Sequence, residues 1–228
     1  MNKEKDYKEW VDRVCSFMEE FGPKINRCTS VFQSKPILDK QPEVVFLGYN
    51  ANENFPFEKV DRDRFYHGNS YFYKERDSWK VWNKLYGMFK WADYLTPMTD
   101  GNFVFMNAVY FGTNKINQFA TIPESKEAIS KCFDFTKELI QDIFKPKCIV
   151  CFSITSCFDR LNKKYGFNDT QTIVPLTVNN EAATIKIKKG MWENIPIYGI
   201  PHPSQAINYD NLGAIVLYLK KEMQSLNI

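Results

Sequence analysis

The sequence predicts an α/β domain with a central parallel sheet. Short apolar runs rich in β-branched residues alternate along the chain with longer segments of helical periodicity. The apolar runs are continuous, as expected for strands buried on both faces. The 228 residues fit one core, so we expect a single domain. Within it, residues 1–40 are predicted as an N-terminal helical extension and 43–223 as the core.

Each element has its own signal. Amphipathic spacing predicts helices over 5–21, from 76–78 onward, and over 124–144, 155–165 and 211–223. Apolar runs predict buried strands over 43–47, 103–109, 148–152 and 195–200. Gly22-Pro23 is expected to end the first helix. Residues 171–189 alternate apolar and polar around Asn179-Asn180, which predicts a hairpin of two strands.

Composition excludes several classes of protein. With 44% hydrophobic and 25% charged residues, the chain resembles neither a disordered segment nor a membrane bundle. No apolar run approaches the ~20 residues that span a bilayer. The opening MNKEKDYKEW is too polar for a signal peptide, so we expect a cytoplasmic protein with no membrane partner. The net charge of +3 does not by itself indicate a nucleic-acid partner. The six cysteines are expected as free thiols.

Unusual polar groups follow three of the predicted strands. The first strand runs into residues 48–52, the second ends near Asn107, and the last leads to residues 201–204. Ligands of open α/β sheets bind beyond the carboxyl ends of the strands, so these groups are candidates for one site. Each also has a structural interpretation: residues 48–52 as a turn, Asn107 as a partner for loop backbone, and His202 as a structural residue between prolines.

Other motifs narrow the choice. The only histidines are His67 and His202, and His67 lies in a polar loop, so His202 is the better catalytic candidate. Phosphate-loop and dinucleotide motifs are absent from the sequence. The spacing of Cys148, Cys151 and Cys157 comes nearest to metal ligation, but thiols within a strand are usually buried hydrophobes. We therefore expect no metal and no cofactor.

Five segments, in order, resemble the uracil-DNA glycosylase superfamily and cover most of residues 43–220. VVFLGYNAN is similar to its first motif, FVFMNAV to the strand that ends in a base-reading asparagine, and IPIYGIPHPS to the strand that leads to its His-Pro-Ser motif. FKPKCIVCFSITSCFDRL resembles a further strand and helix, and GNSYFYKERDSWKVW the segment with a base-stacking aromatic residue. The resemblance implies a three-layer α/β/α fold with a central, mainly parallel four-stranded sheet, to which residues 171–189 add a hairpin insertion.

The resemblance also implies a function. Such enzymes are monofunctional DNA glycosylases that flip uracil or a related deaminated base out of DNA and hydrolyse its N-glycosidic bond. By motif position, Asn50 orients the attacking water and His202 stabilises the departing base anion. Asn107 reads the base edge and Phe72 stacks on the base, or Tyr71 if the register shifts by one residue. The other substrate-binding positions are Gly48, Tyr49, Asn52 and Ser204. The expected partner is DNA with a damaged base, bound by a monomer.

Two motifs depart from the family pattern. Ala51 and Asn52 stand where the family has proline and then tyrosine or glycine, so its barrier against the thymine methyl group is missing or differently built. Gln205-Ala206 replace Pro-Leu, which removes the leucine that fills the vacated stack; Ile207 comes one residue late. A DNA- or base-binding protein without turnover is therefore an alternative, and a nucleotide-processing enzyme unrelated to DNA is a third.

Further positions refine these expectations. An asparagine in the first motif, as in the mismatch-specific and single-strand-selective branches, orients water but is no strong base, so a slow enzyme is expected. Arg62, Arg64 and Lys74, in a loop longer than is usual in the family, are either phosphate contacts or solvated charges. Only Cys132 falls near a ligand position of the iron–sulfur branch, so no cluster is expected.

Overall fold

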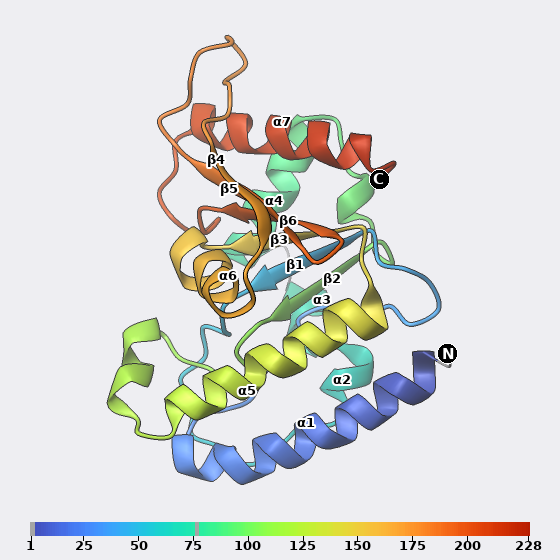
Figure 1. Ribbon diagram of the computed structural model, residues 1–228, viewed down its shortest axis with the longest axis vertical. Coiled ribbons are helices and arrows are strands. Elements are labelled where there is room, and N and C mark those ends of the chain that lie inside the picture. Colours follow the sequence, from blue (N-terminus) through green and yellow to red (C-terminus); the bar gives the residue numbers. More distant parts are fainter. Residues whose placement is uncertain (1–2, 76–77) are drawn as a thin grey trace.

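The computed structural model describes residues 3–75 and 78–228. A six-stranded sheet in the order β2-β1-β3-β6-β5-β4 lies at its centre, with helices on both faces (Figure 1). The strands are β1 (Val44–Gly48), β2 (Phe103–Asn107), β3 (Cys148–Phe152), β4 (Asn168–Ile173), β5 (Ile187–Trp192) and β6 (Ile195–Ile200). The α/β class is as predicted.

The strand count differs from the prediction. The expected four-stranded sheet is wrong, because the sheet is mixed and has six strands: β2, β1, β3 and β6 run parallel, and β5 and β4 continue the sheet antiparallel. The hairpin predicted near 171–189 is present in part: its strands are β4 and β5, whereas residues 174–186 between them lie outside the strands and turn at Asn180, whose φ is 60°. It extends the sheet beyond β6, so β4 rather than β6 forms that edge of the sheet.

One face of the sheet, which we term the α5 face, is covered by helices that lie between residues 3 and 165. They are α1 (Lys3–Ile25), α2 (Arg64–His67), α5 (Ser125–Glu138), η3 (Ile116–Thr121), η4 (Leu139–Phe144), η5 (Ile154–Phe158) and α6 (Asp159–Tyr165). Trp10 of α1 is fully buried in the same cluster as Leu47 and Phe133. The helix runs through Gly22-Pro23 to Ile25, so the predicted stop is wrong by one turn.

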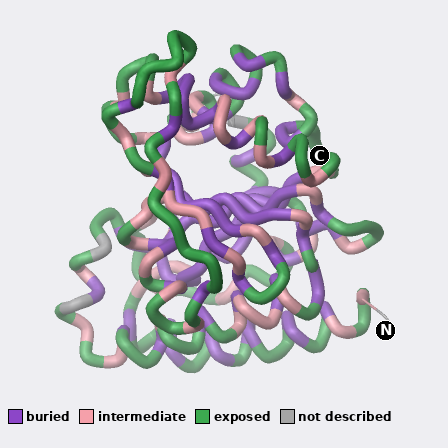
Figure 2. The backbone as a smooth tube through the Cα atoms, turned by 45° about the horizontal axis from the view of Figure 1, so that its top comes forward, coloured by how far each residue is buried: buried purple, intermediate pink, exposed green. Residues whose placement is uncertain are grey.

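The opposite face, termed the α7 face, is covered by α3 (Ser70–Glu75), α4 (Lys80–Trp91), η2 (Thr96–Met98) and α7 (Tyr209–Ser225). Their apolar side chains pack on Phe46 and Phe105 of the strands. The helix predicted from 76–78 onward corresponds to α4, and residues 76 and 77 lie outside the described residues. Figure 2 shows the strands buried between these layers and the exposed residues on the outside.

The parallel strands end together at what we call the carboxyl edge. Gly48 pairs with Asn107, and Phe152 with Ile200, so these four residues lie at one level of the sheet. The chain continues from them into the three segments that the sequence marked for function. No helix in the described part of the chain is long and apolar enough to cross a membrane.

Candidate functional site at the carboxyl edge

Gly48 and Asn107 form the centre of the carboxyl edge. They are register partners, and a Cβ on Gly48 would lie 2.9 Å from Oδ1 of Asn107. The glycine is therefore required for the asparagine amide to occupy its place. Asn107 is buried, and its Nδ2 donates to the carbonyl oxygen of Ser30 at 3.2 Å. Among the described residues, none donates a hydrogen bond to its Oδ1.

A buried polar cluster lies behind Asn107. Nε2 of Gln33 donates to Oγ of Ser30 at 3.2 Å, and Nδ2 of Asn69 donates to Oε1 of Gln33 at 3.3 Å. All three side chains are buried, and they come from segments before β1 and before α3. The backbone N–H of Gln33 also donates to the carbonyl oxygen of Phe105 at 2.8 Å, which holds this segment against β2 beside the amide of Asn107. Sequence reasoning missed these residues, because only their burial in the folded chain distinguishes them from loop polar residues.

His202 has a defined tautomer. Its Nδ1 accepts from the backbone N–H of Ser204 at 3.2 Å and lies 2.7 Å from Oγ of the same residue. A backbone N–H can only donate, so Nδ1 is the acceptor and the neutral ring carries its proton on Nε2. Burial lowers the pKa of His202, which favours this neutral form. No described residue bonds to Nε2, which leaves an N–H donor for a ligand.

Asn50 follows Gly48 by two residues and is half-buried. Its Nδ2 donates to the carbonyl oxygens of Ala51, at 2.8 Å, and Thr113, at 3.1 Å. These two bonds hold the amide with its nitrogen toward the protein. Within residues 3–75 and 78–228, nothing donates to its Oδ1, which can accept a hydrogen bond from water or a ligand.

Phe72 does not present an open stacking face. Its side chain is 0% exposed and makes edge contacts with the rings of Trp79, Trp82 and Phe105. It belongs to the apolar core because α3 packs it between α4 and the sheet, and a base would reach it only after these neighbours move. The adjacent Tyr71, the alternative stacking residue, is 59% exposed.

Phe72 is nevertheless connected to His202 through two rings. Phe105 packs edge-on against Phe152 at 5.4 Å between ring centroids, and Phe152 in turn lies 6.3 Å from the imidazole of His202. These rings form an apolar floor at the carboxyl edge on the α7 face. The floor is why burial, rather than a nearby charge, lowers the pKa of His202.

The remaining candidates are placed differently. Tyr49 lies on the α5 face, because successive residues of a strand point to opposite faces. Its hydroxyl accepts from Nη1 of Arg160 at 2.8 Å, and the guanidinium lies 5.0 Å from the ring centroid. Its side chain is thus directed away from Asn107. Asn52 is exposed, and no described residue bonds to its side chain. Ser204 contacts the His202 ring and so positions the histidine.

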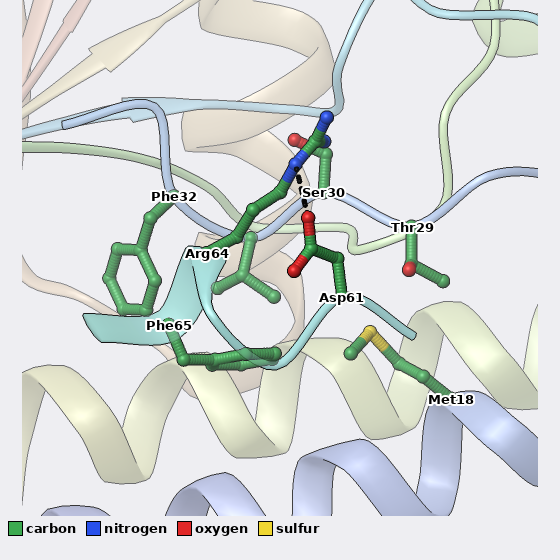
Figure 3. Close-up of a pocket in the computed structure, with 8 residues that line it drawn as sticks. Met18, Thr29, Ser30, Phe32, Asp61, Arg64 and Phe65 are labelled. Atoms are coloured by element: carbon green, nitrogen blue, oxygen red, sulfur yellow. Dashed lines mark ion pairs between the residues drawn. The ribbon is translucent and has the colours of Figure 1, made fainter. Parts of the chain in front are cut away.

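Of the three cationic residues predicted in the long loop after the first strand, two are paired within the chain. Arg62 forms an ion pair with Asp12 of α1. Arg64 lies 3.4 Å from Asp61 and lines a small hollow with Phe65 and neighbouring side chains (Figure 3). Lys74 is exposed on α3. The two arginines therefore act first as structural partners of acidic side chains.

Comparisons with other proteins give no further guidance: no known family model matches the chain, and no curated protein does. All six cysteines are free thiols, as predicted. Among the residues that the structure describes, no three His, Cys, Asp or Glu side chains gather as metal ligands. The carboxyl edge thus offers one N–H donor and two amide oxygens next to an apolar floor, which suits a planar ligand with polar edges.

Proposed function

We propose that the protein is a DNA glycosylase that hydrolyses the N-glycosidic bond of uracil, or of a related deaminated base, extruded from DNA. The observation that carries the proposal is the orientation of His202, whose Nδ1 is occupied by Ser204 and whose Nε2–H is available. It lies at the same edge as the amide oxygens of Asn50 and Asn107, to which no described residue donates. The resemblance of five segments to the uracil-DNA glycosylase superfamily supports the same conclusion.

The chemistry explains why a neutral imidazole is useful here. Breaking the bond leaves positive charge on the sugar and negative charge on the base. A preorganised donor aimed at the base oxygen that gains charge is worth about 3–4 kcal/mol. His202 meets this need with Nε2–H, and burial in the apolar floor both lowers its pKa and strengthens the interaction. The donor requires no proton transfer.

The two asparagines have complementary roles in the proposal. Oδ1 of Asn50 accepts a hydrogen bond from water and so directs its lone pair, but a neutral amide does not take the proton. Oδ1 of Asn107 accepts from a ring N–H on the pairing edge of the base. Uracil and hypoxanthine carry such an N–H, whereas the equivalent ring nitrogen of cytosine is itself an acceptor. This contact therefore favours uracil over cytosine and hypoxanthine over adenine, whereas thymine and guanine carry the same ring N–H.

An excision assay tests the proposal directly. Oligonucleotides that contain uracil, hypoxanthine or a G·T mismatch, single- and double-stranded, are incubated with excess protein and then cleaved with alkali. We expect cleavage at the uracil or hypoxanthine position, and none when cytosine replaces uracil. An absence of abasic sites in every substrate would refute the enzymatic proposal.

The second candidate is a DNA- or base-binding protein without turnover. The departures from the family pattern at Ala51-Asn52 and Gln205-Ala206 favour it, because they change the two motifs that flank the proposed site. This candidate predicts binding to uracil-containing or abasic DNA in fluorescence anisotropy with no product over hours. It also predicts that His202→Ala leaves binding almost unchanged. Product formation that His202→Ala abolishes decides for the enzyme.

A further inference from the structure

The side-chain amide of Asn50 has two backbone carbonyl oxygens on its nitrogen side. Its Nδ2 lies 2.8 Å from the carbonyl oxygen of Ala51 and 3.1 Å from that of Thr113, and we term these two oxygens the carbonyl pair. A carbonyl oxygen only accepts hydrogen bonds, so the group that faces the pair must be a donor. The amide nitrogen carries two hydrogens, one for each oxygen of the pair.

The carbonyl pair is held in place by contacts between the loop after β1 and the segment after β2. The backbone N–H of Thr113 donates to the carbonyl oxygen of Ala51 at 3.0 Å. The backbone N–H of Gly112 donates to the carbonyl oxygen of Cys28 at 2.9 Å. A Cβ on Gly112 would lie 2.6 Å from the carbonyl oxygen of Glu53, so the two segments approach more closely than any other residue at position 112 allows. The positions of both oxygens are therefore set by the fold.

The side chain of Thr113 secures the second oxygen of the pair. It is buried, and its Oγ1 donates to the carbonyl oxygen of Lys115 at 2.9 Å and accepts from the backbone N–H of Lys115 at 3.3 Å. The same hydroxyl contacts the side-chain amide of Gln118. These bonds fix the chain directly after the carbonyl group that faces Asn50. An apolar residue of the same shape would leave them unmade.

We propose, building on the glycosylase function above, that the carbonyl pair selects an amide at position 50 and that Thr113 is a positioning residue for this amide. An ionised carboxylate has only acceptors, so in place of Asn50 it would be repelled by both oxygens. Only a protonated carboxyl group, with one O–H donor, restores the arrangement and leaves its second oxygen where Oδ1 of Asn50 stands. A carboxylate base therefore cannot operate at position 50 of this chain.

The first test follows the excision rate of N50D with pH. Two carbonyl oxygens facing the new carboxyl group should raise its pKa above the ordinary value of about 3.9. We expect the single-turnover rate on uracil DNA, relative to wild type, to be highest near about pH 5 and to fall about tenfold for each pH unit above that pKa. The ratio to wild type cancels the titration of His202, which both proteins share. A carboxylate that acts as a base gives a rising ratio, and a rising or constant ratio overturns the proposal.

Urea unfolding tests the carbonyl pair without any catalysis. A carboxyl group whose pKa is raised by folding stabilises the folded protein at low pH, and this contribution is lost as the pH rises. The loss of stability of N50D relative to wild type should therefore grow from about pH 5 to about pH 8. The matched control N52D adds the same charge at an exposed side chain to which no described residue bonds, so its difference from wild type should stay constant. Equal pH dependence of the two variants overturns the proposal.

The control also accounts for charges near position 50. The ionisable side chains on the surrounding segments are Cys28, Glu53, Arg64, Lys115, Arg160 and His202. Among the described residues, none of these side chains bonds to the amide of Asn50. Asn52 lies two positions along the same loop, well within a Debye length of Asn50, and is subject to the same charges. A difference between N50D and N52D therefore reports the two carbonyl oxygens.

Two substitutions of different polarity test the role of Thr113. T113V removes the hydroxyl and should lower the single-turnover excision rate about tenfold, with the Kd for uracil DNA within about twofold of wild type, because the amide of Asn50 loses its fixed orientation. T113S keeps the hydroxyl and should remain within about twofold in both quantities. T113A, with the same expected loss, replaces T113V if the valine prevents folding. Full activity of a folded variant without the hydroxyl shows that Thr113 does not position Asn50.

The outcomes separate this proposal from the glycosylase function. If the wild-type protein excises nothing, the enzymatic proposal fails on its own, and the urea comparison of N50D with N52D still decides on the carbonyl pair. If the wild type excises uracil and the relative rate of N50D rises with pH, the glycosylase stands and the selection of an amide is refuted.

Discussion

On the α5 face, polar side chains close to the carboxyl edge are bonded within the protein. On the α7 face and at the edge itself, Asn50, Asn107 and His202 each keep one polar atom to which no described residue bonds. Tyr49 is bonded to Arg160, and the hydroxyls of Tyr110 and Thr136 lie 3.0 Å apart. His202 and Asn107, in contrast, each have one polar atom bonded internally and one without a partner among the described residues. Complete internal pairing indicates a structural role, whereas half-paired groups with a fixed orientation indicate a ligand site.

The largest expected effect comes from substituting the two aromatic polar residues that represent the two regions, His202 and Tyr49. His202→Ala should lower uracil excision by about 10²- to 10³-fold, because it removes the preorganised donor. Tyr49→Phe should leave excision within about threefold and cost about 1 kcal/mol of stability through the lost bond to Arg160. Single-turnover kinetics and urea unfolding measure both. If Tyr49→Phe lowers excision as much as His202→Ala, the two faces do not differ as described.

Two glycine-to-alanine substitutions test the same difference between the faces, because each adds one methyl group to one face. Gly48→Ala places a Cβ 2.9 Å from Oδ1 of Asn107 and should lower excision about 10- to 100-fold by displacing that amide. Gly199→Ala places a Cβ 2.8 Å from the side chain of Phe158 on the α5 face. It should destabilise the protein by about 1–3 kcal/mol through overpacking and spare the site. Unchanged excision by folded Gly48→Ala would remove Asn107 from the mechanism.

The pH dependence of stability should report on His202. Its pKa in the folded protein is lowered from 6.5 by burial, so the unfolded chain binds the proton first as the pH falls. The free energy of unfolding is therefore not reduced by His202 above about pH 7. It declines as the pH falls through 6.5 toward the lower pKa of His202 in the folded protein. His202→Asn should flatten this decline in urea unfolding.

NMR spectroscopy can determine the tautomer of His202 directly. His67→Gln leaves one histidine, so nitrogen chemical shifts in NMR spectra are assigned without ambiguity. We expect the neutral ring to be protonated on Nε2. A signal for protonated Nδ1 would contradict the proposed donor.

The smallest effect concerns Ser153, where β3 leaves the sheet. Its φ is 79° and its ψ is 114°, a conformation that costs a residue with a Cβ about 1–3 kcal/mol. Its Oγ accepts from the backbone N–H of Ser156 at 3.2 Å, a cap that glycine replaces at a cost of a few tenths. Ser153→Gly should therefore stabilise the protein by about 1 kcal/mol in thermal unfolding. A lower melting temperature would show that the cap outweighs the strain.

Much of the fold was predictable because its signals are local. The runs that become β1, β2, β3 and β6 are apolar on both sides, and a buried parallel strand has that pattern. The hairpin was also visible as alternation around Asn179-Asn180. That β5 would join β6 was not, because local pattern marks a strand but does not specify its partner. Likewise, Pro23 did not stop α1, since it falls within the last turn.

The site was predictable to a lesser extent. Asn107 and His202 stand out as polar residues in rigid apolar surroundings, which is a sequence signal. The burial of Phe72 has no such signal, since an aromatic residue in a short helix is equally consistent with a core or a stacking position. Nor does any local feature mark Gln33 or Asn69, which lie 36 positions apart and meet only in the folded chain.

The amino-acid order by itself determined which segments become strands and helices, and that polar groups follow three strand ends, because hydrophobic periodicity and residue type act over a few neighbouring positions. The tertiary structure decided which atoms of those groups form hydrogen bonds within the protein. Whether Oδ1 or Nδ2 of Asn107 is free, and which nitrogen of His202 holds the proton, depends on backbone groups brought beside them by folding. A hydrogen bond requires a partner at about 3 Å, and only the folded chain provides that distance.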